Sequence, residues 1–263
     1  MNLANDNIDG HLYFYGINLC SEPANTNTKN IVFVHGFPGR PHDFRWLIPE
    51  LTNHNLYFVA LPGQGYTDRD SIETMGVQSN GDFIERCISH WKLEEFYIVG
   101  HSMGGAIGSF IAQRNRRCKG LILLSSVGIR PHKAFRRAPP QLPFYLLNTK
   151  FSMLFQPLIK WVFVTMGFPK GIDTKTIYTV LEHVCCFSFT DHHQDLKKVL
   201  EQNLPIMIVY AKNDPLIEKD IFEELCEVTS PTLILAYEDG GHNPQKKHAK
   251  EIGIKINQIL QQP

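Results

Sequence analysis

The chain has 263 residues, and its 26 basic side chains equal its 26 acidic ones, so the formal net charge is zero. Hydrophobic residues make up 43% of the chain and charged residues 20%. This balance excludes an intrinsically disordered chain, and the zero net charge excludes the broad basic field that attracts nucleic acid. The length predicts one globular domain with room for an insertion.

Six continuous apolar runs predict β-strands, and helical patterns lie between the first four of them. Runs that do not alternate with polar residues are typical of strands covered by helices on both faces. Before them, the segment His11–Leu19 predicts a hairpin at an antiparallel edge. Alternation of strand and helix predicts an α/β fold with a mostly parallel, doubly wound sheet. The predicted strands are Ile31–His35, Leu56–Leu61, Phe96–Val99, Leu121–Leu124, Ile206–Tyr210 and Thr232–Leu235, and the predicted helices are Asp43–Leu51, Ser79–Trp91 with Ser79 as N-cap, and Met103–Asn115.

The interval between the fourth and fifth predicted strands is longer than a simple crossover, which needs about 30 residues for a whole βαβ unit. This interval is rich in Phe, Leu, Trp and Met. It predicts a helical cap at residues 131–200, inserted into a core formed by residues 1–130 and 201–263. The basic run Arg130–Arg137 is interpreted as solvated surface, with an anion or lipid-headgroup site as the alternative.

The aromatic residues of the predicted cap have three interpretations. They pack the cap onto the core, or some of them line an acyl pocket. Contact of the cap with a membrane is the third, and it requires an exposed apolar face. The residues are Phe144, Phe151, Phe155, Trp161, Phe163 and Phe168.

Three features predict a cytoplasmic location. The first ten residues lack the basic and apolar regions of a signal peptide. The longest apolar stretch, Phe151–Phe168, is interrupted by Gln156, Pro157 and Lys160, so we expect no transmembrane helix. The six cysteines form no CxxC pair, and we expect reduced thiols.

The strongest functional signal is Gly100–Gly105 (GHSMGG), which fits the pattern G-x-S-x-G between a predicted strand and a predicted helix. A serine on such a sharp turn projects above the sheet edge, and small neighbours let other backbone pass close by. The helix N-terminus that follows offers free N–H groups and a positive partial charge. We therefore predict that Ser102 is a nucleophile and that the Met103 N–H stabilises an oxyanion.

A second signal, His35–Gly39 (HGFPG), directly follows the first predicted parallel strand. By position, the Phe37 N–H would be the second oxyanion donor, and Pro38 fixes the turn because it has no N–H. Two such backbone donors form an oxyanion hole for acyl transfer. The alternative is an ordinary β-turn.

Two further residues follow the fifth and sixth predicted strands, where a doubly wound sheet keeps its site. Asp214 lies in the sequence Asn-Asp-Pro, and His242 follows two glycines. We predict that His242 is the base for Ser102 and that Asp214 fixes its tautomer. Glu238 and Asp239 compete for the role of the acid, but their place in the same loop as the histidine makes the geometry awkward.

With these motifs, residues Ile31–Ile259 resemble the α/β-hydrolase superfamily, at HGFPG, LPGQG, GHSMGG, ND and GGH. The resemblance implies an α/β-hydrolase fold in which the matching positions are the oxyanion hole, a turn, the nucleophile, the acid and the base. The stretch 128–133 (GIRPHK) also looks like an uncharacterised branch associated with nematodes.

The chain departs from the superfamily pattern at Ala60, where an Asp is usual before LPGQG. HGFPG also resembles the loop of epoxide hydrolases, but those carry an aspartate where this chain has Ser102, which disfavours epoxide opening. The signature His-x4-Asp of one lipid acyltransferase branch is absent. His192, His193 and Asp195 could suggest a metal, but adjacent histidines on a helix point about 100° apart, so we expect no metal site.

The sequence thus predicts a serine hydrolase acting on a carboxylic ester or thioester of a hydrophobic small molecule or lipid, without a cofactor. One alternative is a protein that binds a ligand or partner on the same fold without hydrolysis. A second is acyl transfer to an acceptor other than water, or perhydrolysis. Neither the substrate nor the oligomeric state can be derived from these residues.

Overall fold

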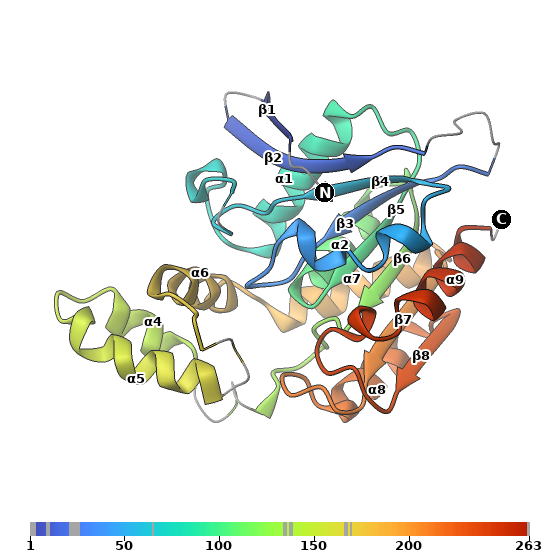
Figure 1. The fold of residues 1–263 in the computed structure, drawn as a ribbon. Coiled ribbons are helices and arrows are strands. Elements are labelled where there is room, and N and C mark those ends of the chain that lie inside the picture. Colours follow the sequence, from blue (N-terminus) through green and yellow to red (C-terminus); the bar gives the residue numbers. More distant parts are fainter. Residues whose placement is uncertain are drawn as a thin grey trace.

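The computed structural model describes residues 4–8, 11–20, 27–64, 66–133, 136, 139–165, 168 and 170–261. Its centre is an eight-stranded sheet in the order β1-β2-β4-β3-β5-β6-β7-β8 (Figure 1). β1 and β2 pair antiparallel, β2 pairs antiparallel with β4, and all later pairs are parallel. The strands are β1 (Ala4–Ile8), β2 (His11–Asn18), β3 (Asn30–Val34), β4 (Asn55–Val59), β5 (Phe96–His101), β6 (Cys118–Leu124), β7 (Ile206–Ala211) and β8 (Leu233–Tyr237).

Helices cover both faces of this sheet, as the alternating pattern predicts (Figure 1). On one face α1, α2, α7 and α8 pack over the strands, and on the other α9 and two 3-10 turns do so. The α-helices are α1 (Val77–His90), α2 (Met103–Arg114), α4 (Gln141–Leu147), α5 (Ser152–Thr165), α6 (Thr174–Cys185), α7 (Phe189–Glu201), α8 (Lys219–Thr229) and α9 (Ala249–Leu260), and the 3-10 turns are η1 (Pro41–Phe44), η2 (Ile48–Glu50), η3 (Arg69–Ser71) and η4 (Pro244–Lys246).

The central strands are buried on both sides, which explains their continuous apolar sequences. Every residue of β5 and of β7 is buried. β8 differs because it lies at the edge of the sheet, and only Leu235 in it is buried. The hairpin expected within residues 11–19 is not formed. Residues 11–18 are instead one strand, which pairs antiparallel with β1.

Two helix predictions are wrong in detail. Residues 43–51 do not form an α-helix, because Pro49 lacks the N–H that a continuous helix requires. Residues 43 and 44 end η1, residues 45–47 form a turn, and residues 48–50 form η2. The helix predicted from Ser79 begins two residues earlier, at Val77, with Gly76 as its N-cap. The Ser79 hydroxyl is hydrogen-bonded to that of Thr74 at 2.9 Å, so it does not cap the helix.

A helical cap stands away from the sheet, and α4, α5 and α6 form it (Figure 1). These helices share their own apolar cluster, centred on Ile159, Phe163 and Ile177. α7 also lies in the range expected for the cap, yet its Leu196 and Val199 belong to the cluster beneath the sheet. The exact division of the chain at residues 131 and 200 therefore stays a prediction.

The cap is fixed to the core near the cavity by an ion pair and a ring stack. Arg69 in η3 pairs with Glu182 in α6 at 2.5 Å. The ring of Phe37 stacks on that of His183 in α6, with centroids 4.0 Å apart. In the part of the chain that the structure describes, no helix is both long and apolar enough to cross a membrane.

Candidate active site

Ser102 occupies a sharp turn between β5 and α2, as the sequence predicts. Its backbone has φ 54° and ψ −123°, outside the regions that non-glycine residues favour. The turn is held because the Ser102 N–H donates to the Leu124 carbonyl at 2.9 Å and the Ser102 carbonyl accepts from Gly105 N–H at 3.0 Å. A Cβ atom at Gly104 would overlap the Val34 carbonyl, so only glycine lets α2 begin this close to β3.

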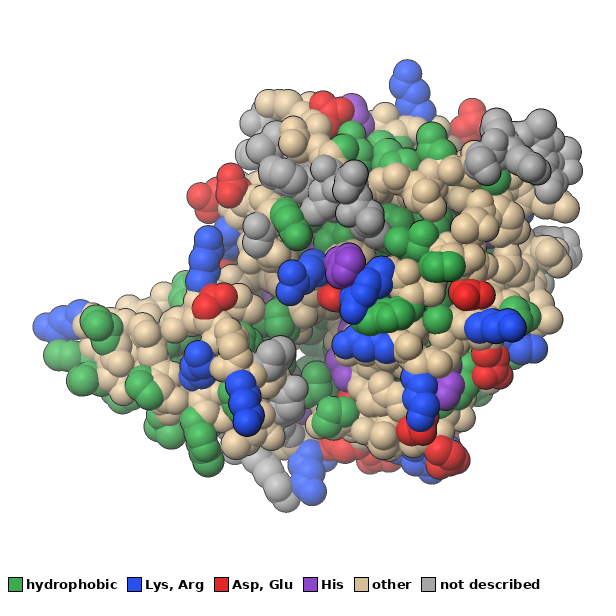
Figure 2. All heavy atoms as spheres, in the orientation of Figure 1, with side chains coloured by type: hydrophobic (Ala, Val, Ile, Leu, Met, Phe, Trp, Pro, Cys, Tyr) green, Lys and Arg blue, Asp and Glu red, His purple; other side chains and the backbone are tan. Residues whose placement is uncertain are grey.

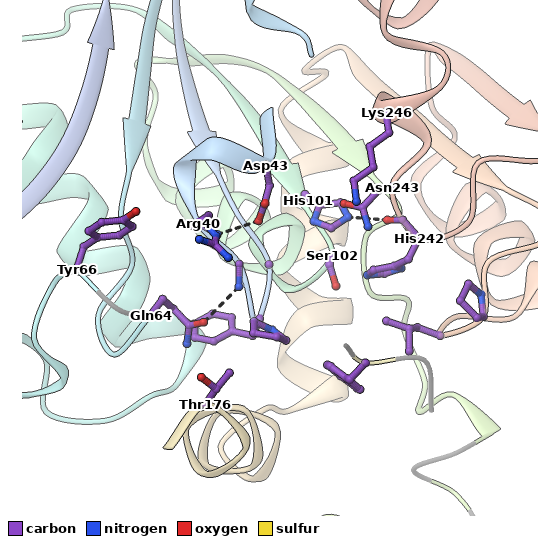
Figure 3. Close-up of a pocket in the computed structure, with 17 residues that line it drawn as sticks. Arg40, Asp43, Gln64, Tyr66, His101, Ser102, Thr176, His242, Asn243 and Lys246 are labelled. Carbon is purple, nitrogen blue, oxygen red and sulfur yellow. Dashed lines mark hydrogen bonds between the residues drawn. The ribbon is translucent and has the colours of Figure 1, made fainter. Parts of the chain in front are cut away.

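The turns after the parallel strands meet around a cavity of about 690 Å³ (Figure 3). Ser102 and His242 both line it, with Phe37 and Leu216. Four segments far apart in sequence converge here because parallel strands place their carboxyl ends at one edge of the sheet. The structure thus brings the predicted nucleophile, the predicted base and the HGFPG turn to one place.

His242 is hydrogen-bonded to Asp214, with 2.7 Å between Nδ1 and Oδ2. The Asp214 side chain is fully buried, and its other oxygen, Oδ1, accepts from Leu216 N–H at 2.8 Å and from Ile217 N–H at 3.1 Å. A carboxylate can only accept hydrogen bonds, so the proton of the His242 ring lies on Nδ1 and leaves Nε2 free to accept. Asp214 therefore fixes both the tautomer and the orientation of the imidazole.

The two competing acids are engaged elsewhere. Glu238 pairs with Lys212, and Asp239 pairs with Lys247 at 2.5 Å and with His248 at 3.1 Å. Both carboxylates point to cations outside the cavity. Among the three candidates considered from the sequence, the structure joins only Asp214 to the imidazole of residue 242.

The loop that carries His242 bends through two glycines with positive φ. Gly240 has φ 132° and Gly241 has φ 58°, conformations that cost other residues about 1 kcal/mol or more. The Gly241 N–H donates to the side chain of Asn213 at 2.9 Å, which ties this loop to the one carrying Asp214. The two glycines before His242 therefore allow the backbone conformation that this loop adopts.

Figure 3 shows the Ser102 side chain and the His242 ring at the cavity that both of them line. Among the described residues, no hydrogen bond joins the Ser102 hydroxyl to this ring. Hydrogen bonds of this kind are often long without substrate and tighten in the complex. The arrangement leaves both the hydroxyl and the ring facing the space where a substrate would lie.

Of the two predicted oxyanion donors, Phe37 lines this space, and Met103 directly follows Ser102, which also lines it. Met103 is the first residue of α2, so its N–H has no partner four residues earlier in the helix. Phe37 lies in the turn after β3 and lines the cavity. Gly36 in that turn packs against the nucleophile turn, because a Cβ there would come within 2.7 Å of Ser102 Cβ. These contacts bring the two turns together, as a pair of backbone donors requires.

His101 contributes a contact that the sequence did not reveal. Its Nε2 lies 2.7 Å from the carbonyl oxygen of His242, and it must donate because a carbonyl only accepts. Burial lowers the pKa of His101 to about 3, so the ring is neutral. No local sequence pattern indicates this contact, since the two residues lie 141 positions apart in the chain. His101 thereby fixes the backbone that carries the predicted base.

His35 has a similar role in the HGFPG turn. Its Nδ1 donates to the Gly36 carbonyl at 2.9 Å, and its Nε2 accepts from Leu61 N–H at 3.1 Å. Burial lowers the pKa of His35 to about 4, which keeps the ring neutral and able to make both bonds. This histidine joins the turn after β3 to the one after β4.

The walls of the cavity combine apolar and cationic side chains. Phe168 and Thr176 reach it from the cap side, whereas Arg40 and Lys246 reach it from the core. Figure 2 shows Lys and Arg side chains around the hollow between the cap and the core. Within the described part of the chain, no cluster of three or more His, Cys, Asp or Glu residues could hold a metal ion.

Known proteins agree with this architecture. Residues 31–252 match the alpha/beta hydrolase family. Lipase 3 of Moraxella sp. (strain TA144) is 22% identical over 88% of this chain and 77% of that lipase. The 2-succinyl-6-hydroxy-2,4-cyclohexadiene-1-carboxylate synthase of Escherichia coli O8 (strain IAI1) is 29% identical over 37% of this chain and 36% of that enzyme.

Among solved structures, bromoperoxidase from Bacillus anthracis superposes with a TM-score of 0.73 at 16% identity, covering 99% of this chain and 100% of that one. This similarity concerns the fold, which is the mostly parallel sheet with a helical cap that the sequence predicts. The family match spans most of the chain, from β3 into α9. The chain therefore belongs to the alpha/beta hydrolase family.

Proposed function

We propose that this hydrolase cleaves a carboxylic ester or thioester of a hydrophobic small molecule or lipid through an acyl-Ser102 intermediate. The observation that carries the proposal is the 2.7 Å hydrogen bond between His242 and the buried Asp214, beside the cavity that Ser102 lines. A histidine whose tautomer is fixed in this way is suited to take a proton from an adjacent hydroxyl.

In the first step, Ser102 Oγ attacks the carbonyl carbon of the substrate while His242 Nε2 takes the hydroxyl proton. Asp214 stabilises the imidazolium that forms. The negative charge that develops on the carbonyl oxygen is bound by the N–H groups of Phe37 and Met103. Loss of one such donor costs about 3–4 kcal/mol of transition-state stabilisation.

The tetrahedral intermediate then collapses and the bond to the leaving group breaks. His242 returns its proton to the departing alcohol or thiol, and the acyl group stays on Ser102. Water enters, gives a proton to His242 and attacks the acyl carbon. The bond to Ser102 Oγ then breaks, His242 returns the proton to that oxygen, and the carboxylic acid is released. No cofactor takes part in these steps.

The cavity supports a small hydrophobic substrate. Its volume of about 690 Å³ lies within the roughly 300–1,000 Å³ that ligand pockets span. Phe37, Phe168 and Leu216 supply apolar walls near the two reacting side chains. The similarity to a protein named Lipase 3 points in the same direction.

The test is hydrolysis of a series of p-nitrophenyl esters of increasing acyl length by the wild type and by Ser102→Ala. We expect turnover to fall by roughly a million-fold in the variant, as for a nucleophile that acts with its base as one unit. Ser89→Ala is the matched control because Ser89 is exposed on α1, and it should keep full activity. An equally active Ser102→Ala variant would exclude the proposed nucleophile.

The alternative without hydrolysis, a protein that binds a ligand or partner, predicts binding of the esters with no release of nitrophenol. Transfer to another acceptor is the second alternative, and the structural similarity to a bromoperoxidase makes peroxide worth including. Product analysis with added alcohol or peroxide separates the cases, because hydrolysis alone gives only the carboxylic acid. For the compartment we propose the cytoplasm, since the structure shows free thiols at Cys87, Cys118, Cys185, Cys186 and Cys226.

A further inference from the structure

The cap carries an unusual concentration of exposed apolar side chains. Seven large hydrophobic residues on or between α4 and α5 are 55% to 81% exposed. Figure 2 shows hydrophobic side chains along the outer edge of the cap, far from the sheet. Exposed apolar side chains concentrated in this way mark an interaction site. The seven residues are Leu142, Tyr145, Phe151, Met153, Leu154, Leu158 and Trp161.

These side chains form an outward face of helices whose other face is already packed. On α5, Leu154, Leu158 and Trp161 follow a spacing of four and three residues, which places them on one side of the helix. Ile159 and Phe163 point the other way and are 5% and 3% exposed, within the apolar cluster that α5 shares with α6. The cap therefore has its own core, and the exposed face is additional to it.

Residues 131–172, which include α4 and α5, carry basic side chains but no acidic ones, although the whole chain is neutral. Arg136 is neutralised by Glu218 of the core, with 3.4 Å between them. Lys150 and Lys160 lie beside the exposed face, and no ion pair to either is formed among the described residues. The Lys150 ammonium lies 5.2 Å from the Phe151 ring centre, at the margin of this face.

We propose that the exposed face of α4 and α5 docks onto an anionic lipid bilayer. Trp161 and Tyr145 have the amphipathic rings that are enriched at the level of lipid headgroups. The leucines between them would enter the acyl boundary, and the two lysines would reach the negatively charged headgroups with their apolar stems along the surface. The helices lie on the membrane and do not cross it.

The charge pattern favours a bilayer over a second copy of the chain. Two copies joined through this face would bring the cations of one cap against those of the other, with no acidic residue in 131–172 to compensate them. An anionic bilayer supplies the missing negative charge. Phe168 and Thr176 of the same cap region line the cavity, so docking would bring the cavity near lipid. That lipid would then serve as substrate rests on the proposed function, whereas the docking itself does not.

The experiment is flotation with vesicles of phosphatidylcholine alone or mixed with phosphatidylserine. The wild type should float with the mixed vesicles, and a Leu158→Glu/Trp161→Glu variant should bind at least about tenfold more weakly. Ile254→Glu is the matched control, because Ile254 is an exposed apolar residue on α9, and it should bind like the wild type. Replacement of Lys150 and Lys160 by Gln should weaken binding to the mixed vesicles roughly fivefold per lysine, the equivalent of about 1 kcal/mol per charge.

Activity and assembly are measured in parallel. The leucine/tryptophan, lysine and Ile254 variants should hydrolyse a short soluble ester like the wild type. Ser102→Ala should float normally although it does not hydrolyse the ester, so that failure of docking and failure of the proposed chemistry are distinguishable. Equal flotation of the cap variant and Ile254→Glu would overturn the proposal. So would the absence of wild-type flotation together with a dimer that the cap substitutions dissociate, because the occupant would then be a second copy.

Discussion

The role of Asp214 gives the sharpest prediction, because its three hydrogen bonds determine what an amide would do in its place. In Asp214→Asn, the amide oxygen can accept from the N–H groups of Leu216 and Ile217, as Oδ1 does now. The NH₂ group then faces His242 Nδ1 and can only donate to it. The imidazole is driven into the tautomer with its proton on Nε2, which cannot take a proton from Ser102.

The expected loss follows from this tautomer change. In a serine triad the same substitution lowers kcat by about ten thousand-fold, which corresponds to roughly 5.5 kcal/mol of activation free energy. The fold should survive because Asn has the shape of Asp and keeps both backbone hydrogen bonds. The assay is steady-state hydrolysis of the best p-nitrophenyl ester near neutral pH, with thermal unfolding measured on the same samples.

Glu238→Gln is the matched control, since Glu238 precedes His242 in the same loop but pairs with Lys212. Its kcat should stay within about twofold of the wild type, because surface ion pairs contribute little. The reasoning is refuted if Asp214→Asn retains kcat within about tenfold, or if Glu238→Gln loses as much as Asp214→Asn does. In either case another group orients the imidazole.

Three further predictions concern the surroundings of the site. Gly104→Ala should lower the free energy of unfolding by about 1–3 kcal/mol, because its Cβ would overlap a backbone carbonyl of β3, whereas Gly171→Ala, with open space around it, should be nearly neutral in urea unfolding. His101→Asn should lower kcat by about tenfold with KM unchanged, because the bond that fixes the backbone of His242 is lost; a change confined to KM would contradict this. Stability should fall with acidification: burial lowers the pKa values of His35 and His101 to about 4 and about 3, so below pH 6.5 the unfolded chain binds protons that the folded one does not. Each such histidine costs about 1.4 kcal/mol per pH unit until its folded pKa is reached, and a urea midpoint that is equal at about pH 7 and pH 5 would contradict the assignment.

The parallel core could be predicted from sequence because its determinants are local. The apolar run before Gly36 has no polar alternation, and β3 forms there with both faces covered. The same reasoning failed at 43–51, where the apolar spacing suggested a helix. Pro49 has no N–H for a continuous helix, and the segment contains two short 3-10 turns instead.

The order of the site residues along the chain could be predicted from sequence, but the contacts between them could not. Ser102, Asp214 and His242 follow strands that a doubly wound sheet aligns, so their meeting at one edge is expected from topology. The bond from His101 to the backbone of residue 242 depends on how two loops 141 positions apart approach each other. No local pattern encodes that approach, and the cations at the mouth of the cavity, Arg40 and Lys246, were missed for the same reason.

The proposed mechanism requires that the hydroxyl of Ser102 is activated as a nucleophile beside the cavity. Its most direct test is incubation with a fluorophosphonate, followed by intact-mass measurement and peptide mapping. We expect one adduct per chain, on the peptide that contains Ser102, with labelling slowed by several orders of magnitude in Asp214→Asn. A folded wild-type protein that stays unlabelled, or that is labelled at another serine while Ser102 remains free, would contradict it.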